Sequence, residues 1–139
     1  MDLKQHSFIY KQVVSWGDMD AFGHVNNVVY YRYIENARIA YLDQVDLLNY
    51  PIHIVVASSQ CKYLAPVTYP DILNIKVEVL EIRNSAFSMC YLLWSETQQK
   101  NIAEAEVVIV CVDRNTGQKM TIPDQLKKDL FILKAHATL

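Results

Sequence analysis

The chain has 139 residues, of which 52% are hydrophobic and 20% charged, with a net charge of −2. These values are typical of a chain that folds around one core, and they exclude a disordered protein. A nucleic-acid-binding protein normally carries a basic stripe, and this sequence has none. No apolar run is as long as a membrane-spanning helix, and residues 1–6 lack the apolar stretch of a signal peptide. We therefore expect a cytoplasmic protein with one domain over residues 1–139 that binds neither nucleic acid nor membrane.

The first part of the chain is predicted to form a strand, a loop and a long helix. Residues 8–14 alternate in polarity, as in a strand with one buried face. From about Asn27 to Asp46, apolar residues recur at three- and four-residue spacing, which is typical of an amphipathic helix. Their stripe consists of Tyr30, Tyr33, Ile34, Ala37, Tyr41 and Val45. Either Asn26 or Asn27 is suited to be the N-cap of this helix.

The other side chains of this helix are expected to lie outside the core. Arg32, Glu35 and Arg38 are predicted to form a solvated face with local ion pairs. Ile39 and Leu42 do not belong to the main stripe. We expect these two side chains to meet another protomer or the rim of a sheet.

The rest of the chain is predicted to form four strands, at residues 52–64, 72–82, 86–96 and 102–112, and a short helix at 124–135. Six consecutive apolar residues at 107–112 indicate a central strand that is covered on both faces. Because the strands follow one another directly, the sheet should be largely antiparallel and the fold class α+β. One long helix covers only one face of such a sheet. The other face needs the C-terminal helix or a second protomer, which predicts a dimer or larger assembly.

The segment 16–27 contains the side chains that are best suited to take part in a reaction. It contains two carboxylates, a histidine and two asparagines: Asp18, Asp20, His24, Asn26 and Asn27. These residues directly precede the long helix, and the N–H groups of a first helical turn have no intrahelical acceptor. Such N–H groups can donate hydrogen bonds to an oxyanion, and a nearby carboxylate can act as a nucleophile or a base. The segment therefore contains both parts that attack on a carbonyl requires.

The pattern D-x-D-x-x-G-H-V-N-N-x-x-Y-x-x-x-x-E-x-A-R runs from Asp18 to Arg38. It resembles the hotdog-fold acyl-CoA thioesterases of the 4-hydroxybenzoyl-CoA thioesterase superfamily, and the order and length of the predicted elements agree with that family. The resemblance implies a five-stranded antiparallel sheet wrapped around one long helix. It also implies protomers that join their sheets edge to edge as a homodimer or homotetramer, with the active site at the dimer interface, beside the helix N-terminus.

The resemblance also implies roles for individual residues. The family's catalytic carboxylate is the second aspartate of D-x-D, which is Asp20 here, and the backbone N–H that polarises the thioester carbonyl is that of Asn27. The related plant acyl-carrier-protein thioesterases use an aspartate, an asparagine two residues later and a histidine four residues later. Asp20 and His24 match this arrangement, whereas Phe22 occupies the asparagine position. His24 is thus a candidate for chemistry, substrate binding or loop orientation, and Asp18 is expected to support the loop.

The resemblance implies hydrolysis of an acyl-CoA, or a related acyl thioester, to free acid and thiol. Asp20 would act as nucleophile or as general base on water, and no cofactor is expected because hydrolysis moves no electrons. A non-catalytic acyl-thioester-binding protein and a hotdog hydratase or dehydratase stay open as alternatives, since fold does not fix function. Asp18, Asp20 and His24 could also be metal ligands, but no second ligand cluster follows, so no metal is expected.

The substrate is expected to lie beside the helix start. The acyl group would pack against the apolar part of the strand segment 54–61. Because the chain has a net charge of −2, we expect only a few local Lys or Arg contacts to the phosphates of coenzyme A. Lys62 is a candidate for one of them.

Overall fold

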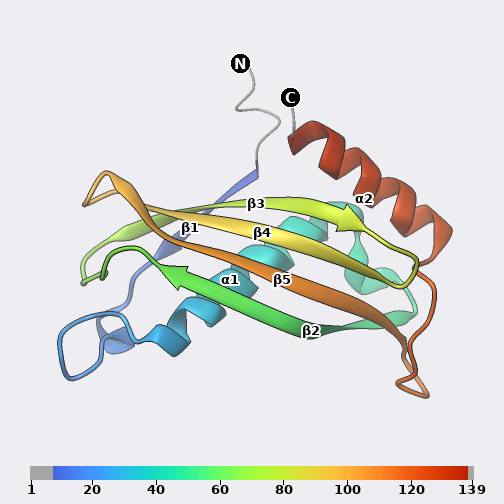
Figure 1. Ribbon diagram of the computed structural model, residues 1–139, viewed down its shortest axis with the longest axis horizontal. Helices are drawn as coiled ribbons and strands as arrows, with labels where there is room; N and C mark the ends of the chain where they lie inside the picture. The colour runs from blue at the N-terminus through green and yellow to red at the C-terminus, as the bar shows by residue number, and fades with distance from the viewer. Residues whose placement is uncertain (1–7, 138–139) are drawn as a thin grey trace.

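The computed structural model of the protein describes residues 8–137 (Figure 1). Its elements in chain order are β1 (Phe8–Val13), α1 (Asn27–Leu42), β2 (Ile52–Tyr63), β3 (Ile72–Ile82), β4 (Ala86–Ser95), β5 (Lys100–Asp113) and α2 (Asp124–Ala137). Short 3-10 turns occur at Trp16–Asp18, Asp43–Val45 and Leu47–Asn49. The predicted order of strands and helices is confirmed.

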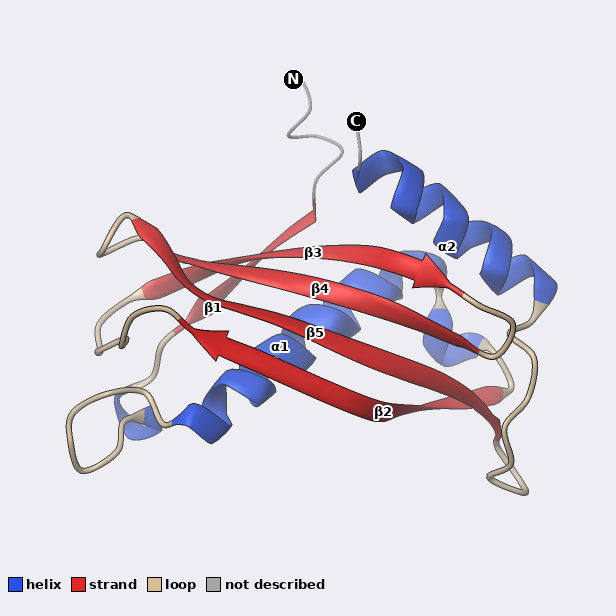
Figure 2. Ribbon diagram, in the orientation of Figure 1, coloured by secondary structure: helices blue, strands red, loops and turns tan. Residues whose placement is uncertain are grey.

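The five strands of the described region form one sheet in the order β1-β3-β4-β5-β2, and all neighbouring strands are antiparallel. β1 and β2 are therefore the two edges. Figure 2 shows α1 lying across one face of the twisted sheet. The predicted α+β class and the five-stranded antiparallel sheet around one long helix, the hotdog arrangement, are confirmed.

The apolar stripe of α1 forms the centre of the core. The stripe residues within α1 are each exposed by 3% or less: Tyr30, Tyr33, Ile34, Ala37 and Tyr41. They share the core with alternate side chains of β3, β4 and β5, namely Leu73, Ile75, Val77, Met89, Tyr91, Leu93, Val107 and Ile109. Burying one large apolar side chain stabilises a fold by about 1.5–3 kcal/mol. This packing fixes α1 on the sheet and therefore fixes where its N-terminal end lies.

Two predictions about the helix were wrong. α1 ends at Leu42 rather than Asp46, because the chain continues into 3-10 turns and Asp46 adopts a left-handed conformation with φ of 52°. Arg38 is 7% exposed rather than solvated, and its Nη1 donates to the hydroxyl of Tyr91 at 3.3 Å. A long aliphatic stem allows an arginine to lie along apolar surface. Leu42 is buried within its own chain, whereas Ile39 is exposed.

The second helix does not cover the outer face of the sheet, which is the face turned away from α1. Leu126 and Leu130 of α2 belong to the same core as α1, and α2 contacts β3 and the turn Asp43–Val45. The outer face carries half-buried apolar side chains, including Leu92, Trp94, Val108 and Val110. β5 is thus an interior strand, but the described residues cover it fully only on the α1 side.

Candidate active site

A cavity of about 290 Å³ lies at the N-terminal end of α1. It is lined by Asp20, His24, Val25, Asn27, Tyr30, Tyr63, Leu64, Ala65 and Pro66. These segments meet because the loop before α1 and the final residues of β2 lie at the same end of the molecule (Figure 1). The structure therefore brings the three candidates from the sequence, Asp20, His24 and Asn27, to one cavity.

Asp18 ties the loop before α1 to the helix. Its Oδ2 accepts the hydroxyl hydrogen of Tyr33 at 2.5 Å and lies 3.4 Å from the backbone nitrogen of Ser15, and its carbonyl oxygen accepts from the N–H of Asn26. Burial, followed by the bond to Asp18, raises the pKa of Tyr33, so this hydroxyl keeps its proton at neutral pH. Asp18 does not line the cavity, and its contacts agree with the supporting role expected from the sequence.

Asp20 uses one carboxylate oxygen to hold its own loop. Its Oδ1 accepts from the backbone N–H of Phe22 at 2.9 Å and of His24 at 3.3 Å. Backbone bonds between Asp20 and both Gly23 and His24 close the same turn. The turn requires a φ of 80° at Gly23, a conformation that glycine adopts at little cost. Among the described residues, Oδ2 of Asp20 receives no hydrogen bond, so one oxygen of an oriented carboxylate is available at the cavity.

The first turn of α1 supplies a candidate oxyanion donor. Asn26, rather than Asn27, is the N-cap, because its Oδ1 accepts from the N–H of Val28 at 3.0 Å. Its carbonyl oxygen accepts from the N–H of Val29. The hydrogen bonds of the described residues include none from the N–H of Asn27. This N–H lies at the positive end of the helix dipole, where it can donate to an oxyanion.

Tyr63 is the site residue that sequence reasoning missed. Its hydroxyl donates to the carbonyl oxygen of Asn27 at 3.0 Å. Its ring packs edge-on against Tyr30, with 4.9 Å between the ring centroids. Burial, with a smaller effect from Cys61, raises the pKa of Tyr63 to about 12, so the hydroxyl is a hydrogen-bond donor at neutral pH. The sequence places Tyr63 at the end of a strand, and only the topology brings that end to the start of α1.

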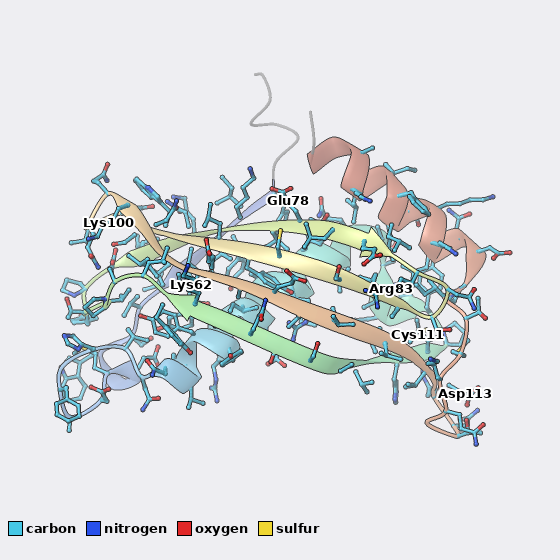
Figure 3. The ribbon with its side chains drawn as sticks, viewed as in Figure 1. Lys62, Glu78, Arg83, Lys100, Cys111 and Asp113 are labelled. Carbon is cyan, nitrogen blue, oxygen red and sulfur yellow. The ribbon has the colours of Figure 1, made fainter. Side chains whose placement is uncertain are left out.

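Lys62 and the segment 54–61 do not line this cavity in the single chain. A β-bulge between Val56 and Ser58 shifts the register of β2 against β5. Beyond the bulge, Tyr63 pairs with the buried Ala103 and Lys62 with the exposed Glu104, so the two side chains point to opposite faces. Figure 3 shows Lys62 on the outer face, where it lines a hollow together with Glu78.

The described part of the chain has neither a cluster of metal ligands nor a helix that could span a membrane. Within residues 8–137, no three side chains of His, Cys, Asp or Glu are grouped so that they could hold a metal ion. In the same range, neither helix has the length and apolar character needed to cross a membrane.

Comparison with known proteins identifies the family. The sequence profile of the thioesterase-like superfamily matches residues 14–130. The chain belongs to the thioesterase-like superfamily. This result confirms the resemblance seen in the segment that begins at Asp18.

Individual members of the superfamily match most of the chain. The acyl-CoA thioester hydrolase YbgC of Escherichia coli is 30% identical over 118 residues, which cover 81% of this chain and 87% of YbgC. The uncharacterized protein YsmA of Bacillus subtilis is 32% identical over 127 residues, or 90% of this chain and 86% of YsmA. A thioesterase from Thermus thermophilus, solved with coenzyme A and Zn, is 27% identical with a TM-score of 0.81, over 94% of this chain and 95% of that one.

Proposed function

We propose that this chain hydrolyses an acyl-CoA, or a closely related acyl thioester, to a free acid and a thiol. The observation that carries the proposal is the shared cavity of Asp20 and the Asn27 N–H at the start of α1. Membership in the thioesterase-like superfamily supports the reaction type. The similarity to YbgC and to the thioesterase that binds coenzyme A supports an acyl-CoA as the substrate.

Asp20 attacks the thioester carbonyl directly or removes a proton from the water that attacks it. In both cases negative charge develops on the carbonyl oxygen, and the Asn27 N–H stabilises this charge by a hydrogen bond. The carbon–sulfur bond then breaks, and the leaving thiolate takes up a proton, which in the general-base route is the one that Asp20 removed from water. In the direct route the acyl group stays on Asp20 as an anhydride, and water hydrolyses it to the free acid and the free carboxylate. His24 is the third candidate, because it lines the cavity and its backbone N–H donates to Oδ1 of Asp20.

Product analysis separates this proposal from its two alternatives. The purified full chain is incubated with an unsaturated acyl-CoA, and the mixture is followed by mass spectrometry. We expect free acid and coenzyme A in equal amounts. A product heavier by one water, with the thioester intact, would instead indicate a hydratase. Substrate that stays chemically unchanged and remains bound when the protein is purified again from the mixture would indicate a non-catalytic binding protein.

We also propose that the protein works as a homodimer or homotetramer. In the sheet that the described residues form, β2 is an edge strand whose outward-facing backbone groups have no partner, and its Val55 and Val56 are exposed. A long exposed edge is suited to pair with another chain. This edge ends at Tyr63, so pairing there would place a second protomer close to the cavity.

Light scattering coupled to size-exclusion chromatography tests the assembly. At micromolar concentration we expect a mass of two or four chains, because residues 8–137 of one chain leave both the sheet edge and the outer face uncovered. The mass of one chain is 16.1 kDa. If a species of that mass hydrolysed thioesters at the full rate, an active site at a protomer interface would be contradicted.

A further inference from the structure

Tyr63 connects two elements that are far apart in the sequence. Its backbone belongs to the end of β2, and its hydroxyl bonds to the first residue of α1, Asn27, at 3.0 Å. Asn27 is otherwise exposed. Among the described residues, this is the only side-chain hydrogen bond from β2 to the backbone of the first turn of α1.

The orientation of Tyr63 is fixed on two sides. Its ring is held edge-on against Tyr30, which is 2% exposed and belongs to the core. The bulge between Val56 and Ser58 sets the face to which the last residues of β2 point, because one additional residue reverses the alternation of a strand. Without the bulge, Tyr63 would point away from α1. Both features therefore direct the hydroxyl towards the helix start.

We propose that Tyr63 is a positioning residue, whose hydrogen bond to the Asn27 carbonyl holds the first turn of α1 so that the Asn27 N–H points at the oxyanion. The inference rests on the function proposed above and adds a residue to it. Oxyanion stabilisation depends on donors that are held in place before the reaction, and a displacement of about 1 Å can reduce a rate by about 10²-fold. Asn26 caps the N–H groups of the turn, whereas Tyr63 restrains the turn relative to the sheet.

Tyr63→Phe tests the inference, because it removes the hydroxyl and keeps the ring that packs on Tyr30. We expect kcat to fall by about tenfold while KM changes by less than about twofold, since the hydroxyl acts on the transition state through Asn27. Tyr69→Phe is the matched control. Tyr69 is a similarly exposed tyrosine outside the cavity, and we expect this variant to keep the kcat of the wild type.

Amide hydrogen exchange of the segment 24–31 gives a second readout that requires no substrate. In Tyr63→Phe we expect faster exchange in this segment and an unchanged melting temperature, because the first helical turn loses its restraint while the core is retained. Tyr69→Phe should exchange like the wild type.

Wild-type kcat in Tyr63→Phe would overturn the inference, as would a change confined to KM or unchanged exchange in the segment 24–31. Asp20→Asn, assayed in parallel, separates this failure from that of the proposed function. If Asp20→Asn loses activity while Tyr63→Phe does not, only the role of Tyr63 is wrong. If the wild type releases no thiol from any acyl-CoA, the proposed function is wrong, and the exchange rates still decide whether Tyr63 restrains the helix.

Discussion

Replacing Asp20 with asparagine is expected to lower kcat for thioester hydrolysis by about 10²–10⁴-fold, the range attributed to a general base. The fold should persist, because an asparagine Oδ1 can accept the same bonds from the N–H groups of Phe22 and His24 that hold the loop. What the substitution removes is the negative charge and the free oxygen at the cavity. Steady-state kinetics and a thermal melt of the variant and the wild type measure both effects.

Asp18→Asn is the matched control for this experiment. It makes the same chemical change in the same loop, and an asparagine oxygen can still accept from Tyr33 and Ser15. Because Asp18 does not line the cavity, we expect kcat to stay within about tenfold of the wild type. Near wild-type turnover in a folded Asp20→Asn variant would contradict the assignment of Asp20. A larger loss in Asp18→Asn than in Asp20→Asn would move the catalytic role to Asp18.

The second large expected effect is the dependence of kcat/KM on the length of the acyl group. The values of kcat/KM should rise along a series of straight-chain acyl-CoAs until the cavity is full, because each buried methylene contributes about 0.8 kcal/mol, or about fourfold. The cavity provides apolar wall from Val25, Leu64, Ala65 and Pro66. The nucleotide part of coenzyme A should contribute less, since the chain has a net charge of −2 and Lys62 lies on the outer face.

This prediction is checked by measuring kcat/KM for straight-chain and aromatic acyl-CoAs at two salt concentrations. We expect a strong dependence on acyl length and a weak dependence on salt, because salt screens only contacts between exposed charges. A flat response to acyl length combined with a steep dependence on salt would show that charge, and not the acyl group, selects the substrate.

The fold could be predicted from the sequence because its elements have clear periodicity. The helical stripe that contains Tyr30 and Ala37 is buried as a unit, and the strands 72–82 and 86–96 were placed almost to the residue. The errors arose where a residue type does not reveal its surroundings. Arg38 has a charge that suggests solvent, but the residue is 7% exposed and its guanidinium donates to the hydroxyl of Tyr91.

Only the site residues that lie close together in the sequence could be predicted. Asp20, His24 and Asn27 are close in the sequence, and one loop brings them to one cavity. Tyr63 comes from a strand that is distant in the chain, and its orientation depends on the bulge between Val56 and Ser58. Simple alternation along β2 from the inward-facing Ile54 would turn Lys62, and not Tyr63, towards α1. The bulge has no signal in composition or periodicity.

The most direct test of the central claim is the number of thiols that the purified full chain releases from a panel of acyl-CoAs. We predict that at least one acyl-CoA is cleaved with many turnovers per protomer, and that Asp20→Asn removes most of this activity without unfolding the protein. Release of no more than one thiol per protomer from every acyl-CoA, by a correctly folded protein, would contradict the claim that this chain is a thioesterase.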